Sequence, residues 1–425
     1  MPLATRRSKS KRRKRLASSP SSTKPGRKKH LFVLQHGLWG DPVHVSHIKD
    51  VIHQKFDKNS LGMSVHTYLA QSNRGVKTYS GARECGRRLY REVKNIIAKI
   101  QPTHISFVGY SAGGIYVRYA LSLFDEEGLF EMVKPMNLYI LCSPNAGTTR
   151  FELQDYDIFG FNMYNFATRC IPSFIGGKTA KEFVFQDDPE YPLLHLMSLE
   201  PFTCTIRKFK LRKVYGNIFN DRAVGFRTGC LYPYENPYTK FEGVNPFASS
   251  SHKLGQYVGC QISLTQKKNG KERGKRLGPI SLKIARTDAS QKPGSIRGTL
   301  IKYTTIVFLY TVIFPLLLTI VFPVMLVIAR TCHYSEKGQT PTAEGKAKDI
   351  LSNISGSKLT TVERTLAVIH NLRDNGVFNE TVHCWLPGFS THGTLVCRNY
   401  SKPWVPNARD GASVVNDMVG GMCLQ

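Results

Sequence analysis

Acidic side chains are scarce in this chain of 425 residues, where 30 Asp and Glu stand against 59 Lys and Arg and leave a formal charge of +29. Residues 1–30 carry 12 basic and no acidic residues, and residues 253–302 carry 12 basic residues against two acidic ones. The rest of the chain is only mildly basic, unlike the evenly basic body of many nucleic-acid binders. Residues 1–30 contain no Phe, Trp or Tyr and residues 253–302 contain one, Tyr257, so neither segment has the series of stacking aromatics that single-stranded nucleic acid requires. These absences disfavour a nucleic-acid-binding protein.

Paired cysteines are also lacking, because none of the ten cysteines belongs to a CxxC pair. Zinc ribbons and thioredoxin chemistry are therefore not expected. No apolar run follows the basic residues at the start of the chain, so a cleaved secretory signal is not visible. We expect reduced thiols in a chain that faces the cytosol.

From His30 onward, strand and helix patterns alternate, which predicts an α/β fold with a mostly parallel sheet covered by helices. The expected strands are HLFVLQ, Met63–Leu69, His104–Val108, Met136–Cys142 and Leu211–Ile218. The expected helices are Val43–Phe56, Ala82–Ile100, Ala112–Leu123 and Leu359–Leu372. The last helix is predicted to bury the face made by Leu359, Val362, Leu366 and Ile369.

Changes in composition divide the chain into four parts. Residues 1–29 read as a disordered basic arm, which suits a solubilising tail, a nuclear-localisation patch or an anionic-surface tether. Residues 30–260 form the expected core, with an aromatic-rich cap at about 149–199 that is either a lid over a site or part of the core. Residues 261–350 read as an insertion, and residues 351–425 as the last part of the core. The cap aromatics are Phe151, Phe159, Phe161, Tyr164, Phe166 and Phe174.

The strongest motif is Gly109-Tyr110-Ser111-Ala112-Gly113, placed directly after a strand and before a helix. This is the G-x-S-x-G pattern of a nucleophile elbow in its required context. The flanking glycines relieve the clashes of a sharp turn, and the serine hydroxyl is left at the positive end of the helix. A chance glycine-rich turn is the alternative.

A second element supports the serine reading. His36-Gly37-Leu38-Trp39-Gly40 follows the first expected strand, and a loop there can point the Leu38 N–H into the site, opposite the Ala112 N–H. Two such donors make an oxyanion hole. His36 itself is expected to shape the loop rather than transfer protons.

A nucleophilic serine needs a base and an orienting acid, in the chain order Ser, acid, His. Asp221 comes just after the expected strand Leu211–Ile218, which suits the orienting acid. The other candidates for the acid lie in the cap: Asp155, Asp157, Asp187 and Asp188. His392 lies in a loop-like stretch before an apolar run, and His383 and His370 are its alternatives. No metal or organic cofactor is expected.

These motifs together resemble the fungal "putative serine esterase" family, and within it the lipid-droplet phospholipase branch. The resemblance rests on HLFVLQHGLWG, GYSAGGIYVRYAL, LYILCSPNAGT, the stretch from PLLHLMSLEPF to FRTG, and HGTLVCR. It covers about residues 29–245 and 355–425. It implies an α/β-hydrolase fold, lipid-ester substrates, and Ser111, Asp221 and His392 as nucleophile, acid and base. Asn145 departs from the histidine that many members carry in that turn.

Residues 303–329 are 27 residues without a charged side chain. At about 1.5 Å a residue, a helix of this length could cross a hydrocarbon core of about 30 Å. A single crossing would separate Ser111 and Asp221 from His392, however, and Pro315 and Pro323 interrupt the run. We therefore expect a monotopic hairpin at a lipid-droplet monolayer or the cytosolic face of the endoplasmic reticulum. A pair of core helices is the alternative.

The sequence thus predicts a serine-dependent lipid ester hydrolase, with glycerophospholipid as the first choice of substrate. A neutral-lipid lipase and an acyltransferase would use the same triad. The alternative that is not an enzyme is a catalytically silent membrane scaffold. Residues that bind the substrate, head-group preference and oligomeric state leave no mark in the sequence that we can read.

Overall fold

The computed structural model describes most of the expected core. The described residues are 28–56, 62–148, 157–158, 161–162, 177–240, 280–284, 319, 323–324, 327, 340–354, 359–386, 391–402, 404–405 and 407–425. Most of the cap aromatics, the basic arm before residue 28 and most of the hydrophobic segment 303–329 lie outside them. Within this part of the chain, no helix is both long enough and apolar enough to span a membrane.

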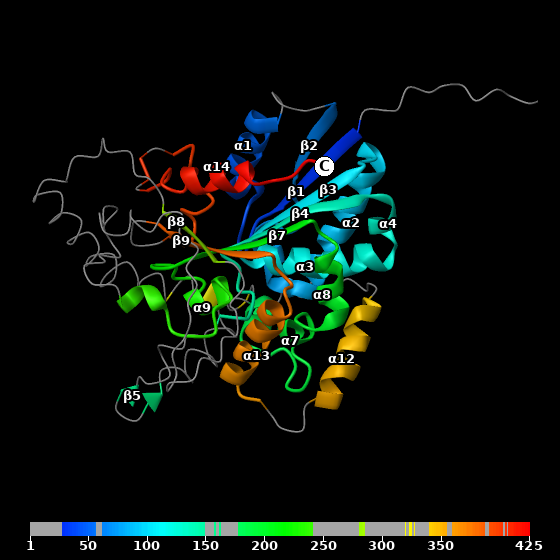
Figure 1. The fold of residues 1–425 in the computed structure, drawn as a ribbon. Helices are drawn as coiled ribbons and strands as arrows, with labels where there is room; N and C mark the ends of the chain where they lie inside the picture. Colours follow the sequence, from blue (N-terminus) through cyan, green and yellow to red (C-terminus); the bar gives the residue numbers. More distant parts are fainter. Residues whose placement is uncertain are drawn as a thin grey trace, which may run out of the picture.

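A parallel sheet forms the centre of the described structure (Figure 1), and its strands lie in the order β2-β1-β3-β4-β7-β9-β8. Every pair of neighbouring strands in it is parallel. The predicted parallel α/β architecture, with helices on both faces of the sheet, is confirmed. In chain order the strands are β1 (Lys28–Gln35), β2 (Met63–Leu69), β3 (His104–Tyr110), β4 (Lys134–Leu141), β7 (Leu211–Asn217), β8 (Ile280–Ile284) and β9 (Glu380–Trp385).

Helices cover both faces of the sheet. On one face, α1 (Ser46–Phe56) packs beside α14 (Ala412–Gly420), so segments from the two ends of the described chain meet there (Figure 1). The other face carries α2 (Ala82–Ile100), α3 (Ala112–Glu126) and α8 (Glu200–Arg207). Outside these lie α7 (Leu193–Leu196), α12 (Thr342–Ile354) and α13 (Thr361–Asp374). Shorter elements are η1 (Pro42–Val45), η2 (Gly75–Ser80), α4 (Leu129–Met132), β5 (Asp157–Ile158), β6 (Phe161–Asn162), α6 (Gly177–Phe183), α9 (Phe226–Gly229) and η4 (Pro237–Lys240).

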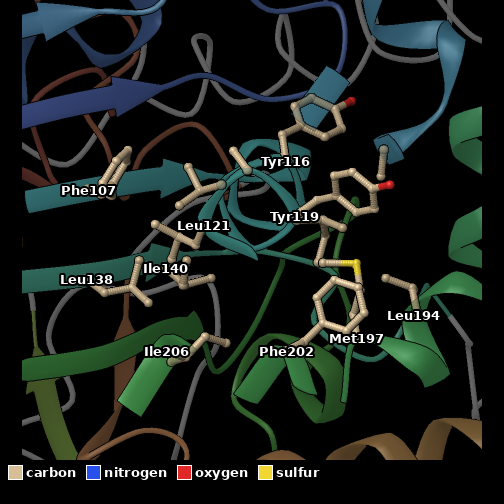
Figure 2. Close-up of a cluster of buried hydrophobic side chains, with 14 of the residues drawn as sticks. Phe107, Tyr116, Tyr119, Leu121, Leu138, Ile140, Leu194, Met197, Phe202 and Ile206 are labelled. Atoms are coloured by element: carbon tan, nitrogen blue, oxygen red, sulfur yellow. The ribbon is translucent and has the colours of Figure 1, made fainter. Parts of the chain in front are cut away.

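Side-chain alternation along the strands supplies two apolar cores. In β1, Leu31 and Val33 belong to the core under α2 and α3, whereas Phe32 and Leu34 belong to the core under α1 and α14. This follows from the two-residue period of a strand, and near-continuous apolar runs are typical of strands buried on both faces. Figure 2 shows the first core, where α3 lies between the strands on one side and α7 and α8 on the other, and Tyr119 points toward Met197 and Phe202. Its labelled members are Phe107, Tyr116, Tyr119, Leu121, Leu138, Ile140, Leu194, Met197, Phe202 and Ile206.

Most predicted elements are found within a few residues of their expected bounds, and β2 and α2 coincide with them. The helix expected from Val43 begins as a helix only at Ser46, because Pro42–Val45 forms a 3₁₀ turn capped by the Asp41 side chain. At the other boundary, β1 starts at Lys28, two residues inside the predicted arm.

Several elements were not predicted, among them β9, α8 and α14, and two others lie in segments predicted to be polar. Strand β8 lies in the insertion that reads as polar and basic, and it pairs with β9 as the edge of the sheet. Helix α12 lies in what reads as a polar linker at about 335–350. Its few apolar side chains, such as Ala347 and Leu351, are buried, and ion pairing from Arg83 to Glu344 adds to its attachment.

The predicted buried face of α13 is partly wrong. Ile369 is buried as expected, but Leu359, Val362 and Leu366 are only partly buried. The fully buried stripe runs through Thr365, Val368 and Leu372, because the helix turns this side toward α7.

Candidate active site

Ser111 lies on the sharp turn between β3 and α3, where the nucleophile elbow was predicted. Its backbone has φ 56° and ψ −134°, a conformation that costs energy for any residue with a Cβ. The Ser111 N–H donates to the Leu141 carbonyl at 2.8 Å, which ties the turn to the end of β4. A Cβ on Gly109 would lie 2.6 Å from the Gly114 Cα, and one on Gly113 would lie 2.4 Å from the His36 carbonyl oxygen. Glycine at both positions therefore lets the elbow pack this tightly.

His392 reaches Ser111 from the loop after β9. Its Nε2 lies 3.0 Å from the Ser111 Oγ, and its Nδ1 lies 2.9 Å from an Asp221 carboxylate oxygen. The loop is fixed to the end of β7, because the Thr391 hydroxyl donates to the Phe219 carbonyl at 2.8 Å. The structure thus joins three side chains from distant parts of the sequence into one hydrogen-bonded chain.

Asp221 follows β7 and is held by four hydrogen bonds. One carboxylate oxygen accepts from the backbone N–H groups of Ala223 and Val224, at 3.0 and 2.8 Å. The other accepts from the Asn217 side chain at 3.0 Å and faces the His392 ring. Burial pushes the pKa of Asp221 upward, but the nearby His392 and these donors outweigh it and hold the pKa below the usual value. The group is therefore a carboxylate at neutral pH.

Two supporting residues were missed by the sequence reasoning. Tyr110 donates its hydroxyl to the His392 carbonyl at 3.2 Å, and the two rings pack with centroids 5.2 Å apart. Asn217 binds Asp221 and also contacts the Cys142 sulfur at 3.2 Å. Tyr110 is the last residue of β3 and Asn217 the last residue of β7, but no sequence signal marks them, because their roles depend on the directions of their side chains in the packed sheet.

The loop after β1 lies against the nucleophile. A Cβ on Gly37 would lie 2.4 Å from the Ser111 Cβ, so no side chain fits between the loop and the serine. The N–H groups of Trp39 and Gly40 donate to the Thr78 hydroxyl and the Gly37 carbonyl. In the described part of the chain, the Leu38 N–H has no such partner. Ala112 is the first residue of α3, where helical N–H groups have no intrahelical acceptor. The predicted oxyanion donors are therefore available beside Ser111.

His36 is fully buried, and its Nδ1 donates to the Gly37 carbonyl at 3.1 Å. Burial lowers the pKa of this imidazole. A neutral ring bonded within its own loop fits the predicted loop-shaping role better than proton transfer.

The alternative residues lie elsewhere or have other partners. His383 is buried in β9, bonds the Tyr238 hydroxyl at 2.9 Å, and has its pKa lowered by burial to about 3. His370 lies on the exposed side of α13 beside Asp374. Asp187 accepts from the Leu193 N–H, and Asp188 accepts from the N–H groups that follow it. Asp155 and the Asp157 side chain lie outside the described residues.

One group of potential metal ligands occurs among the described residues. Ligand atoms of Cys142, Asp221 and His392 lie within 4.8 Å of one another. Asp221 and His392 already bond each other, and burial raises the pKa of the Cys142 thiol well above its usual value. The set therefore suits a hydrogen-bonded proton relay better than a metal centre.

Comparison with known families gives one match. The family described as "Putative serine esterase (DUF676)" matches residues 25–233, which include Ser111, Asp221 and the loop of Leu38. His392 lies beyond the matched region.

Curated relatives come from Saccharomyces cerevisiae. "Putative lipase ROG1" is 30% identical over 215 residues, which cover 49% of this chain and 29% of that protein. "Putative lipase YDR444W" is 25% identical over 231 residues, which cover 49% of this chain and 33% of that protein. The chain therefore matches about a third of the length of these relatives.

Solved structures give weaker similarities. "Phospholipase PlaB from Legionella pneumophila" is 12% identical with a TM-score of 0.27, covering 77% of this chain and 64% of that one. The "RedJ-Thioesterase" of Streptomyces coelicolor is 12% identical with a TM-score of 0.25, covering 48% of this chain and 75% of that one. Similarities of this size are too weak to argue from. The family model over residues 25–233 is described as a putative serine esterase, and the relatives, which match 49% of this chain, are described as putative lipases.

Proposed function

We propose that this chain is a serine-dependent lipid ester hydrolase, with Ser111 as nucleophile, His392 as general base and Asp221 as orienting acid. The observation that carries the proposal is the continuous hydrogen-bonded chain from Ser111 Oγ through both ring nitrogens of His392 to Asp221. A catalytically silent scaffold has no need of this geometry, nor of a strained serine backbone at its end. The resemblance to lipases supports the ester chemistry.

The reaction would proceed through an acyl-enzyme. The Ser111 oxygen bonds to the acyl carbonyl carbon while His392 Nε2 takes the hydroxyl proton, and the carbonyl oxygen becomes an oxyanion held by the Leu38 and Ala112 N–H groups. Collapse of this intermediate breaks the ester bond, and the imidazolium gives its proton to the departing alcohol. Water then attacks the acyl-enzyme, with His392 again taking and returning the proton, and the fatty acid leaves.

Asp221 would act through His392 rather than on the substrate. Its contact with Nδ1 keeps the proton on that nitrogen, so that Nε2 is free to accept from Ser111. Its negative charge also stabilises the imidazolium that each proton transfer creates. The lowered pKa keeps this charge in place across the neutral range.

Glycerophospholipid is the substrate we propose first, at a lipid-droplet surface or the cytosolic face of the endoplasmic reticulum. Support comes from the uncharged run at 303–329 and from the similarity to proteins named lipases. Ser111 and Asp221 precede this run, His392 follows it, and the three side chains bond each other. A membrane-embedded run would therefore have to enter and leave by the same face, as a hairpin does. Accessibility tags at residues 290 and 340 in intact membranes test this, since one protected tag would contradict the hairpin.

Incubation of the purified chain with a mixed lipid panel tests the function. Mass spectrometry of the products should show free fatty acid and lysophospholipid, and neither should form with Ser111→Ala. His370→Ala is the matched control, because His370 is an exposed histidine outside the relay. If the only products came from neutral lipids, the proposal of glycerophospholipid as the substrate would be overturned. Equal turnover by Ser111→Ala would overturn the mechanism.

A further inference from the structure

Two loops that border the nucleophile are joined to each other. The Trp39 N–H donates to the Thr78 hydroxyl at 3.0 Å, and the Gly75 N–H donates to the Gly40 carbonyl at 2.9 Å. Arg74 forms an ion pair with Asp41 across the same seam. The first loop also carries Gly37, which packs against Ser111. The joined loops therefore form one wall at the carboxyl end of the sheet, next to the serine.

This wall exposes large apolar side chains. The exposed fractions are 43% for Trp39, 54% for Val43 and 41% for Val76. The Trp39 backbone has φ 52°, the left-handed region that residues with a Cβ rarely adopt. Exposed apolar side chains scattered singly are ordinary, but three on two joined loops beside a reactive group form a candidate interaction surface. We call Trp39, Val43 and Val76 the rim.

Basic side chains are exposed on the two loops and on a neighbouring segment. Asp41 is the only acidic residue of the two loops, and it is paired with Arg74, whereas Lys77 is exposed beside Val76. On the other side lies the segment 391–402, which has no acidic residue and exposes Arg398 and Lys402.

Contacts place this segment next to the first loop. Tyr400 stacks on His47 of α1 with ring centroids 3.8 Å apart. Burial first, and then the nearby charges of Arg398 and Lys402, lower the pKa of His44 to about 4. His44 is therefore neutral above that pH, and the surroundings of the rim carry excess positive charge.

We propose that the rim inserts into an anionic lipid surface and presents Ser111 to it. This inference rests on the proposed lipid ester hydrolysis and adds the surface by which the substrate is reached. Trp and Tyr are the side chains that favour the boundary between headgroups and acyl chains, and Lys and Arg are drawn to anionic headgroups. Transfer of the Val43 and Val76 side chains from water into the acyl-chain region lowers the free energy of binding to the lipid surface. This surface is built from described residues, none of which belongs to the segment 303–329.

Variants of the full chain test the proposal. Val43→Glu combined with Val76→Glu places two charges on exposed positions, and Met132→Glu is the matched control. Met132 is 76% exposed and lies just before β4, at the opposite end of the sheet from Ser111. The rates to compare are hydrolysis of phosphatidylcholine vesicles with and without phosphatidylserine, and hydrolysis of a soluble short-chain ester.

The rim variant should lose about tenfold in vesicle hydrolysis and keep soluble-ester hydrolysis, because only interfacial burial is removed. Wild type and Met132→Glu should match each other and prefer the anionic vesicles. An equal loss of vesicle hydrolysis in Met132→Glu would contradict the proposed role of the rim. So would a rim variant whose ratio of vesicle to soluble-ester hydrolysis equals that of the wild type. If the wild type hydrolyses no ester at all, the proposed function fails instead.

A second measurement does not depend on activity. Trp385 is buried, so replacing Trp404 by Phe leaves Trp39 as the exposed one of the three tryptophans. Anionic vesicles that contain brominated phosphatidylcholine should quench the fluorescence of Trp404→Phe, and addition of Val43→Glu with Val76→Glu should abolish the quenching. Absence of quenching in Trp404→Phe would overturn the insertion of the rim.

Discussion

Replacement of Asp221 by Asn probes the hydrogen-bond chain with the least change of shape. Four donors point at the carboxylate: the N–H groups of Ala223 and Val224 on one oxygen, and Asn217 and His392 on the other. An amide has one oxygen and one NH₂ group, so in either orientation its NH₂ meets two of these donors. The backbone N–H groups cannot reverse, whereas the imidazole can move its proton to Nε2. The amide NH₂ will therefore face His392.

In that tautomer Nε2 donates to Ser111 and cannot take its proton. We expect kcat to fall by about 10⁴, which corresponds to about 5 kcal/mol of transition-state stabilisation. The fold should persist, with a loss of about 1–3 kcal/mol in the free energy of unfolding from the mismatched donors.

The assay is steady-state hydrolysis of a soluble ester, together with thermal unfolding. Asp188→Asn is the control, because Asp188 accepts hydrogen bonds in a separate turn and should leave kcat unchanged. Retention of more than about a tenth of wild-type kcat in Asp221→Asn would refute the tautomer argument.

The pH dependence of stability has a definite sign at this residue. The pKa of Asp221 is lower in the fold than in the unfolded chain, so its contribution is present above about pH 4 and is lost as pH falls through the folded value. Unfolding of Asp221→Asn should therefore depend less on pH than wild type below about pH 4. If the free energy of unfolding of the two proteins changed equally with pH below about pH 4, the lowered pKa of Asp221 would be contradicted.

Three further outcomes follow from the geometry. Gly37→Ala should lower kcat strongly, because the added Cβ would lie 2.4 Å from the Ser111 Cβ, and ester hydrolysis compared with thermal unfolding separates this from misfolding. His383→Gln should keep the pH profile of kcat, since that buried histidine bonds Tyr238 rather than the serine, and an altered profile would reopen its candidacy as base. Burial raises the pKa of Glu182 to about 8, so the free energy of unfolding of the wild type should fall as pH rises from about 4.5 to 8. Glu182→Gln should make this fall smaller. Chemical denaturation at several pH values across this range measures the difference.

The strands from β1 to β7 of the sheet were predictable, whereas β8 and β9 were not predicted. β1, β3 and β4 are nearly continuous runs of buried side chains, and such runs have no other favourable place in a parallel α/β protein. Strand β8 was missed because its five residues lie in a basic, glycine-containing stretch, and its place at the sheet edge depends on pairing with β9 rather than on local pattern. Helix α12 was missed because charge pairs from Arg83 and a few buried apolar side chains hold it.

The candidate site was predictable where chain order and strand ends dictate it. Ser111 and Asp221 each follow a predicted strand, and parallel strands bring their carboxyl ends together. His392 follows β9, which was not predicted, and was proposed from chain order and from its loop-like surroundings. Tyr110 and Asn217 could not be found in this way, since their roles depend on side-chain directions that only the packed sheet defines. For the same reason, the sequence could not tell that Trp39, in the loop predicted to border the serine, is exposed.

Labelling with a fluorophosphonate probe tests the central claim most directly, because the probe reacts only with an activated serine. Peptide mapping of the labelled full chain should find the adduct on Ser111. His392→Ala should abolish the adduct, whereas His370→Ala should not. An adduct on another serine, or undiminished labelling of Ser111 in His392→Ala, would contradict the account.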